Sequence, residues 1–385
     1  MIDPYHSIRH YNQDEAIIAI RRLLSNRKLL TALKFFEPYL NIEDLIAKSE
    51  YFQTVDQFQL AIAKPFIDYF LDKASDGITY LGLDNIKKGN NYLFIANHRD
   101  IVFDTGVLQY FFMTNNYPTT KIAIGDNLLS TPLLRELGKV NKMVTVKRSL
   151  TLRERLENYH LLSEYIHFSI IEEKESVWIA QRNGRTKDGI DQTQPGLIKM
   201  LAMTNAKDPL KALKQLAIVP VTISYEYEVC DQLKARELAL SEIECYKKKP
   251  GEDFNSIKKG LFGHKGHINF VIGKPIINEL DSIPSNLSTK EKISEVCKLI
   301  DSQIYSNYKL FPNHYIAFDQ LENSNEFSDY YSPEQKKLFL RYLGTKSIVK
   351  DVPKEKMMSY LLQIYSNPVK TILGRVNYNI EDKNW

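Results

Sequence analysis

The chain has 385 residues, of which 43% are hydrophobic and 25% are charged, and its formal net charge at pH 7 is +4. This composition is typical of a folded globular protein, and so small a positive charge does not by itself indicate a nucleic-acid partner. The length allows one large domain with additions, or two domains.

The three cysteines, Cys230, Cys245 and Cys297, lie far apart and form no CxxC pair. Their spacing argues against a zinc ribbon or a disulfide framework and favours a reducing compartment. The N-terminal segment has no basic stretch followed by an apolar core, so we expect no signal peptide. No run of about 18 apolar residues occurs, so we expect no transmembrane helix. The sequence therefore predicts a protein that is soluble or lies on a membrane surface.

Residues 14–72 are predicted to be helical, because their apolar residues recur three and four positions apart. Pro65 is expected to kink or interrupt the second helical stretch. From about residue 78, short β-rich runs alternate with longer helical segments. The predicted strands are 92–97, 121–126, 143–148, 176–182, 216–227 and 268–276, and the predicted helices are about 101–114, 131–138, 151–172 and 193–203.

Apolar strands separated by helices are typical of a sheet that is covered on both faces. We therefore predict an α/β fold with a mixed, mostly parallel central sheet and with helical N- and C-terminal additions. The proposed division is an N-terminal helical region, an α/β core and a mainly helical C-terminal region, at residues 1–77, 78–285 and 286–385.

His98 follows the first predicted strand and precedes a predicted amphipathic helix. Active groups in α/β proteins commonly occupy this position, at the carboxyl end of a strand. Asp100 and Asp104 follow within six positions, and either carboxylate could hold the imidazole in the tautomer that a general base needs. A loop histidine followed by a helix cap would give the same pattern without any catalytic role. The sequence has no GxSxG elbow and no cysteine near this site, so a catalytic His98 would activate a group of the substrate.

Two later strands also end in basic residues. Lys147 and Arg148 end the run 143–148, before a possible helix start near Ser149, and such a pair suits phosphate binding. After 176–182, Gly184 permits a sharp turn within a basic loop. Either set could also be a solvated surface turn. The basic loop contains Arg182, Asn183, Gly184, Arg185 and Lys187, and a further apolar run contains Val219, Pro220 and Val221, where Pro220 predicts a sheet edge or a strand end.

The order of these motifs over about residues 78–230, plausibly to 280, resembles the glycerolipid acyltransferase superfamily, which includes glycerol-3-phosphate and lysophosphatidate acyltransferases. The resemblance makes His98 the counterpart of the family's catalytic base and Arg148 that of the arginine in its second block. Gly184 and Arg185 resemble the Gly and Arg of the third block. Val219-Pro220-Val221 resembles the fourth block, which we expect to support the acyl site structurally.

The sequence departs from the family pattern in two places. The family places its acid five residues after the histidine, where this chain has Phe103; Asp100 and Asp104 stand two and six residues after it. We favour Asp104 as the partner of His98, because capping the helix already explains Asp100. In the third block Asn183 stands where the family has glutamate, which leaves the acceptor open and is typical of a divergent bacterial branch.

The resemblance implies that a fatty acyl chain is transferred from acyl-CoA or acyl carrier protein to a hydroxyl of glycerol-3-phosphate, lysophosphatidate or a related polar lipid precursor. It also implies that no metal, no other cofactor and no acyl-enzyme is required, and that basic residues of the second and third blocks hold the acceptor's phosphate. We expect a peripheral enzyme on the cytoplasmic face of the membrane, without a nucleic-acid partner. The N-terminal helices could supply a membrane-binding face, although a docked helix needs the same apolar stripe.

Two alternatives stay open at this point. The same scaffold could acylate the amine of an amino-acid lipid headgroup, or it could be a catalytically inactive protein that binds lipid. Three aromatic residues on the helix after His98 could line an acyl tunnel, although a place in the hydrophobic core explains them better. They are Tyr110, Phe111 and Phe112.

Overall fold

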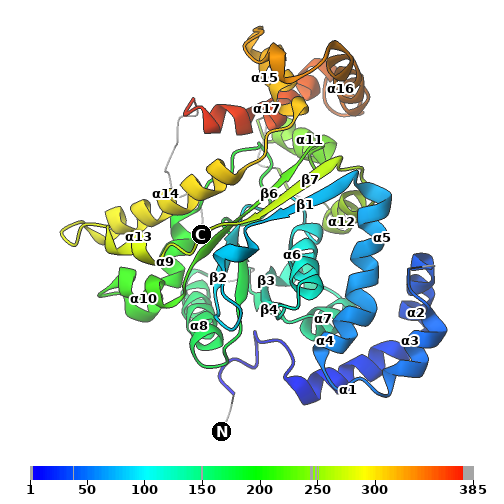
Figure 1. Cartoon of the computed structure of the whole chain (residues 1–385), viewed down its shortest axis with the longest axis vertical. Helices are drawn as coiled ribbons and strands as arrows, with labels where there is room; N and C mark the ends of the chain where they lie inside the picture. Colours follow the sequence, from blue (N-terminus) through cyan, green and yellow to red (C-terminus); the bar gives the residue numbers. More distant parts are fainter. Residues whose placement is uncertain are drawn as a thin grey trace.

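The computed structural model describes residues 3–37, 39–148, 151–242, 246–247, 249 and 251–375. Seven strands form one central sheet, with helices packed around it (Figure 1). The strands in spatial order are β1 (Gly77–Leu81), β7 (His267–Ile272), β6 (Val219–Tyr225), β2 (Leu93–Ala96), β5 (Val177–Ala180), β3 (Lys121–Gly125) and β4 (Met143–Val146).

Every neighbouring pair of strands is parallel except β6 and β7, which are antiparallel. The predicted fold class, a mixed and mostly parallel sheet, is therefore confirmed. The carboxyl ends of β6, β2, β5, β3 and β4 consequently share one edge of the sheet. In register, Ile95 of β2 lies between Ile179 of β5 and Pro220 of β6.

The side chains of β2 show why both faces of the sheet are covered. Leu93 and Ile95 pack into a cluster that also contains the buried residues of α8, α9 and α14. Phe94 and Ala96 point to the other face and join a second cluster with residues of α5 and α6. The helices around the sheet are α5 (Lys64–Ala74), α6 (Phe103–Thr114), α7 (Pro132–Val140), α8 (Leu152–Ile171), α9 (Pro195–Leu201), α10 (Pro209–Gln215), α12 (Glu252–Phe262), α13 (Ile277–Asp281) and α14 (Thr289–Asn307).

Two further hydrophobic clusters lie outside the sheet. The first joins the N-terminal helices to α7, and the second joins α11 to the C-terminal helices. The two groups of helices lie at opposite ends of the molecule, the N-terminal one at lower right and the C-terminal one at the top of Figure 1. They comprise α1 (Gln13–Leu24), α2 (Arg27–Leu33), α3 (Ile42–Ser49) and α4 (Val55–Phe58), and α11 (Asp231–Ser241), α15 (Pro312–Glu322), α16 (Pro333–Lys346) and α17 (Lys354–Ile372).

The structure corrects the sequence-based elements in a few places. The strand β1 was not predicted, and its residues alternate between exposed and half-buried because it forms one edge of the sheet. The predicted strand 216–227 is extended in the sheet only over Val219–Tyr225, with the buried Pro220 as its second residue, so Pro220 marks a strand end and not a sheet edge. Pro65 lies in the first turn of α5, after a π-helical segment over Gln59–Ala63, so the second helical stretch is interrupted as expected. Cys245 and Ser149, both considered in the sequence, lie outside the described residues.

Candidate active site

His98 lies in the loop between β2 and α6, at the sheet edge where five strands end. Its Nδ1 atom is 2.9 Å from Oδ2 of Asp104. Its ring makes an edge-on contact with Trp178 of the neighbouring strand β5, with ring centroids 5.7 Å apart. The side chain keeps 13% of its surface exposed, while that of Asp104 keeps only 2%. An ionised Asp104 fixes the proton on Nδ1 and leaves Nε2 free to accept one.

Asp104 is held by four hydrogen bonds. Its Oδ2 atom also accepts from the backbone amides of Arg99, at 2.6 Å, and Asp100, at 2.9 Å. Its Oδ1 atom accepts from the hydroxyl of Tyr225 on β6, at 2.6 Å. Burial alone would raise the pKa of Asp104, but the hydrogen bonds from His98 and Tyr225 outweigh burial and hold the pKa below its ordinary value. The carboxylate is therefore ionised and fixed in place beside the imidazole.

Asp100 has a different set of contacts. Its Oδ1 atom accepts from the amides of Val102, at 2.8 Å, and Phe103, at 2.6 Å, so it caps the start of α6. Its Oδ2 atom packs against α12, where a Cβ atom added to Gly260 would lie only 2.0 Å away. Burial, and then the charge of Asp104, raise the pKa of Asp100. Of the two carboxylates considered in the sequence, Asp104 is thus the one in contact with His98.

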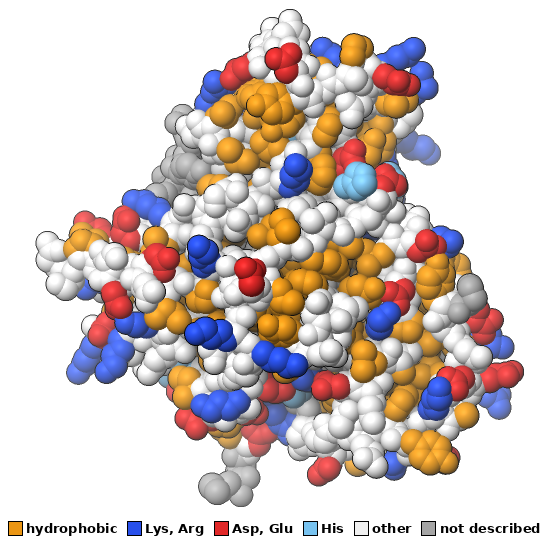
Figure 2. Space-filling model, viewed as in Figure 1, with side chains coloured by type: hydrophobic (Ala, Val, Ile, Leu, Met, Phe, Trp, Pro, Cys, Tyr) orange, Lys and Arg blue, Asp and Glu red, His pale blue; other side chains and the backbone are white. Residues whose placement is uncertain are grey.

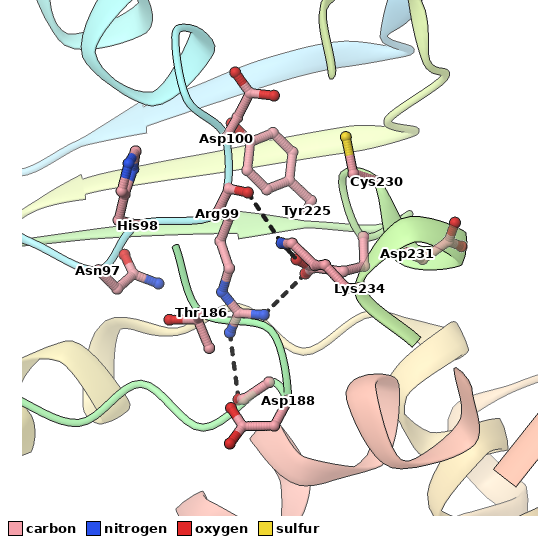
Figure 3. A network of polar contacts seen from close by, with 12 residues as sticks. Asn97, His98, Arg99, Asp100, Thr186, Asp188, Tyr225, Cys230, Asp231 and Lys234 are labelled. Atoms are coloured by element: carbon pink, nitrogen blue, oxygen red, sulfur yellow. Dashed lines mark hydrogen bonds and ion pairs between the residues drawn. The ribbon is translucent and has the colours of Figure 1, made fainter. Parts of the chain in front are cut away.

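Arg99 points away from His98 into a buried network of charges (Figure 3). Its guanidinium forms ion pairs with Asp191, in the loop after β5, and with Glu228, in the turn after β6. Lys234 of α11 also pairs with Glu228 and donates to the backbone oxygen of Arg99, at 3.0 Å. These contacts fasten the His98 loop to two other loops at the same sheet edge.

This network was not predicted from the sequence. Its partners are 92 and 129 residues away from Arg99, which gives no local pattern to detect. The available signal was an arginine directly beside His98, together with acidic residues after two later strands, since a charge at the buried end of a sheet needs partners. Asn97 completes the connection, because its side chain donates to Asp191, at 2.9 Å, and to the backbone oxygen of Ile223, at 3.0 Å.

The basic loop after β5 lies directly against the His98 loop. The amide of Thr186 donates to the backbone oxygen of His98, at 2.8 Å, and the Thr186 hydroxyl donates to Asp191, at 2.7 Å. Gly184 has a φ angle of +74°, which favours glycine, and so supplies the turn that the sequence indicated. The loop is therefore folded back toward the site.

Two cavities border this loop at Arg185. One has a volume of about 460 Å³, and the other, of about 300 Å³, is lined mainly by residues of the loop itself. Within the smaller cavity, Arg148 from the end of β4 meets the basic loop. The Nε atom of Arg182 and the Nη1 atom of Arg185 are buried and have no hydrogen-bond partner among the described residues. Lys187 forms an ion pair with Glu237. Buried, unpaired guanidinium nitrogens are suited to an anionic ligand. The predicted residues that line the smaller cavity are Arg148, Arg182, Asn183, Gly184, Arg185 and Lys187.

Other predicted residues lie elsewhere. Lys147 does not line this cavity. Val219 and Val221 are fully buried in β6, beneath the site, where they pack in the sheet's core. Phe111 and Phe112 belong to the same cluster, and Phe111 stacks on Tyr80 with ring centroids 4.3 Å apart, which agrees with a place in the core and not in an acyl tunnel.

The C-terminal helix α17 braces the basic loop from outside. Asn367 donates to the backbone oxygen of Asp188, at 2.7 Å. Gly189 has a φ angle of +85°, and a Cβ atom there would lie 2.2 Å from the backbone oxygen of Ile364. Tyr365 donates to Asp231, at 3.0 Å, and accepts from the amide of Glu228, at 2.9 Å. The helix α17 therefore contacts both segments to which the His98 loop is joined, the basic loop after β5 and the turn after β6.

Comparison with known proteins agrees with this arrangement. A family model described as Acyltransferase matches residues 77–224, from the start of β1 to within β6. Residues 77–224 thus form an acyltransferase domain. The match agrees with the resemblance to the glycerolipid acyltransferase superfamily that the motifs of this segment indicated. The helices on either side of that segment lie outside the match.

Among solved structures, the chain is similar to the 1-acyl-sn-glycerophosphate (LPA) acyltransferase PlsC from Thermotoga maritima. The identity is 12% and the TM-score 0.40, and the alignment covers 77% of this chain and 100% of that one. A likeness at this level says nothing about the substrate of this chain. The search of curated proteins found no match.

Two further features are absent from the described parts of the chain. No helix there is both long and apolar enough to cross a membrane. No group of three or more His, Cys, Asp or Glu side chains there could hold a metal ion.

Proposed function

We propose that the protein transfers a fatty acyl chain from an acyl thioester to a hydroxyl of a phosphate-bearing lipid precursor, such as glycerol-3-phosphate or lysophosphatidate. One observation carries the proposal. The His98–Asp104 pair, with Nε2 left free, lies on a loop that is bonded to a second loop containing unpaired arginine nitrogens. A base for a hydroxyl and donors for a phosphate are the two groups that such an acceptor needs.

In the proposed step, Nε2 of His98 takes the proton from the acceptor hydroxyl, and the hydroxyl oxygen bonds to the thioester carbonyl carbon. The resulting intermediate breaks its C–S bond, and the thiolate leaves with the proton from the imidazolium. Asp104 keeps Nδ1 protonated and stabilises the positive ring during the reaction. No resident cofactor takes part, and the donor is acyl-CoA or acyl carrier protein.

The acceptor's phosphate would occupy the smaller cavity of about 300 Å³. Arg148, Arg182 and Arg185 would supply its charge-assisted hydrogen bonds. Asn183 replaces the family's glutamate here, so this chain has one negative charge fewer beside the acceptor. The exact acceptor is best found with a panel of polar lipid precursors.

We also propose that the enzyme works on the cytoplasmic face of a membrane as a peripheral protein. Two large apolar side chains, Phe35 and Phe262, are exposed and contact each other with ring centroids 5.6 Å apart. Hydrophobic side chains also gather over the middle of the face in Figure 2, around α6 and the adjoining edge of the sheet. Apolar side chains with a mildly basic chain suit an anionic lipid surface.

Membrane binding is tested with liposomes. We expect the protein to sediment with anionic liposomes and to be released as salt rises, because exposed charges are screened beyond about 10 Å at 0.1 M salt. Neutral liposomes are the control. Release by detergent alone, at any salt concentration, would contradict this electrostatic contribution.

The activity itself is tested by the release of free thiol from long-chain acyl donors over a panel of acceptors. We expect turnover that depends on a hydroxyl acceptor carrying phosphate, with an ester product identified by mass spectrometry. An amide product would instead identify an N-acyltransferase. Lipid binding without thiol release from any donor would identify an inactive scaffold.

A further inference from the structure

The larger cavity, of about 460 Å³, lies between α11, α12 and the segment that joins α16 to α17. Almost all of its lining comes from beyond residue 224, so it lies outside the segment that the family model matches. One lining residue, Arg185, also borders the smaller cavity of the proposed phosphate site. The two cavities are therefore neighbours on either side of one arginine.

The charges of the larger cavity leave several cations available. Arg236 pairs with Asp351, and Lys234 pairs with Glu228, so these two are neutralised. By contrast, the described residues provide no carboxylate within ion-pair distance of the other lining cations. These are Arg185, Lys259 and Lys350. The lining also includes Glu237, which pairs with Lys187, and Glu252, which accepts from the Tyr246 hydroxyl. Cations still outnumber carboxylates, so the cavity is suited to an anionic ligand.

Its other lining residues fit a ligand with a ring system. Tyr246, Leu233 and Val349 supply apolar and aromatic surface, and Asn255 supplies an amide. Phosphates together with a planar base make up a nucleotide, and a base stacks well on aromatic and apolar side chains. The volume is within the range usual for small-molecule sites, roughly 300–1,000 Å³.

The helix α12 connects this cavity to the reacting groups. Gly260 of α12 packs against the Asp100 carboxylate, two residues after His98. Ser256, one turn earlier, lines the cavity, and its backbone oxygen accepts from the thiol of Cys230, at 3.4 Å. The cavity therefore borders the same helix that packs against the His98 loop.

Resting on the proposed function, we infer that this cavity binds the phosphorylated nucleotide end of acyl-CoA. Lys259, Lys350 and Arg185 hold its phosphates, and the pantetheine arm carries the thioester toward His98. The acceptor's phosphate then occupies the smaller cavity on the other side of Arg185. The two substrates approach the base from adjacent cavities, and the donor is a nucleotide thioester and not a carrier-protein thioester.

The test combines Lys259→Gln with Lys350→Gln, both exposed residues whose replacement leaves the core unchanged. We expect the preference for acyl-CoA over acyl-pantetheine, which has the same thioester without the nucleotide, to fall about tenfold, because two charge-assisted contacts are lost. We expect calorimetry to show weaker binding of CoA by a similar factor. As a matched control, Lys290→Gln with Lys309→Gln, two exposed lysines elsewhere, should change neither quantity.

Three results would overturn the inference. These are a native protein that binds no CoA, a double variant with unchanged donor preference, and a double variant whose defect is confined to the KM of the acceptor. The last result would assign the cavity to the acceptor headgroup. CoA binding does not require turnover, so binding that the double variant weakens would support the cavity's role even if no acceptor were acylated. Failure of the proposed function would appear separately, as a native protein that binds CoA but releases no thiol.

Discussion

His98 and Arg99 are neighbours in the chain, but their surroundings differ in kind. His98 is partly exposed and bonds through one ring nitrogen, which leaves the other free. Arg99 is 1% exposed, and its guanidinium is paired with two buried carboxylates. The same contrast separates Arg182 and Arg185, which form no ion pair with a described residue, from Lys234, which is ion-paired with Glu228. Cations without an ion-pair partner at this sheet edge are available to a substrate, and the ion-paired side chains hold the loops in place.

The largest expected effect is on turnover when His98 is replaced. His98→Ala should lower kcat by about 10²–10⁴-fold, because a positioned general base typically contributes that much. Thermal melting should be nearly unchanged, since the side chain is at the surface of the site. His160→Ala on α8, an exposed histidine, is the control. Near-native turnover of a folded His98→Ala protein would exclude the proposed mechanism.

Replacing Arg99 should lower the stability of the fold, which replacing His98 should leave nearly unchanged. Arg99→Met leaves Asp191 and Glu228 with buried, poorly compensated charge, which typically costs about 3–5 kcal/mol of stability. Chemical denaturation measures the free energy of unfolding. Arg153→Met removes an exposed ion pair with Glu157 and should cost less than about 1 kcal/mol. Equal losses for the two variants would show that the Arg99 network does not stabilise the loops.

The third prediction separates the two carboxylates. Asp104→Asn should keep the fold and sharply reduce kcat, because the amide no longer fixes the productive tautomer of His98. Asp100→Asn should be mild, since asparagine caps a helix about as well as aspartate. Turnover and melting of both variants decide the matter. An inactive Asp100→Asn beside an active Asp104→Asn would reverse the assignment.

Much of the site was predictable because of one rule of the fold. Parallel strands end at a common edge, and the structure accordingly brings Arg148, after β4, and Arg185, after β5, to one cavity. The sequence favoured Asp104 over Asp100 because Asp104 lies nearer in register to the family's acid and because Asp100 had another explanation, and the contacts agree with that choice.

The remaining features depend on long-range packing. The edge strand β1 is half-exposed and has no apolar run. The partners of Arg99 are distant in sequence, and local periodicity does not identify which charges become buried. The contacts of α17 with the basic loop are likewise made between residues far apart, such as Asn367 and Asp188. Pattern and propensity therefore placed the reacting groups but not their supports.

The smallest expected effect tests whether the C-terminal region supports the acceptor site. Asn367→Ala removes the hydrogen bond to the backbone oxygen of Asp188, which is worth about 0.5–1.5 kcal/mol. Because that oxygen belongs to the basic loop, we expect the KM of the acceptor to rise severalfold while the KM of the donor stays constant. Gln363→Ala, on the same helix and hydrogen-bonded to Ser359 within it, is the matched control. A change in stability without a change in the acceptor's KM would make α17 a general support of the fold. The specific support of the loops at the proposed site would then come from the Arg99 network and not from α17.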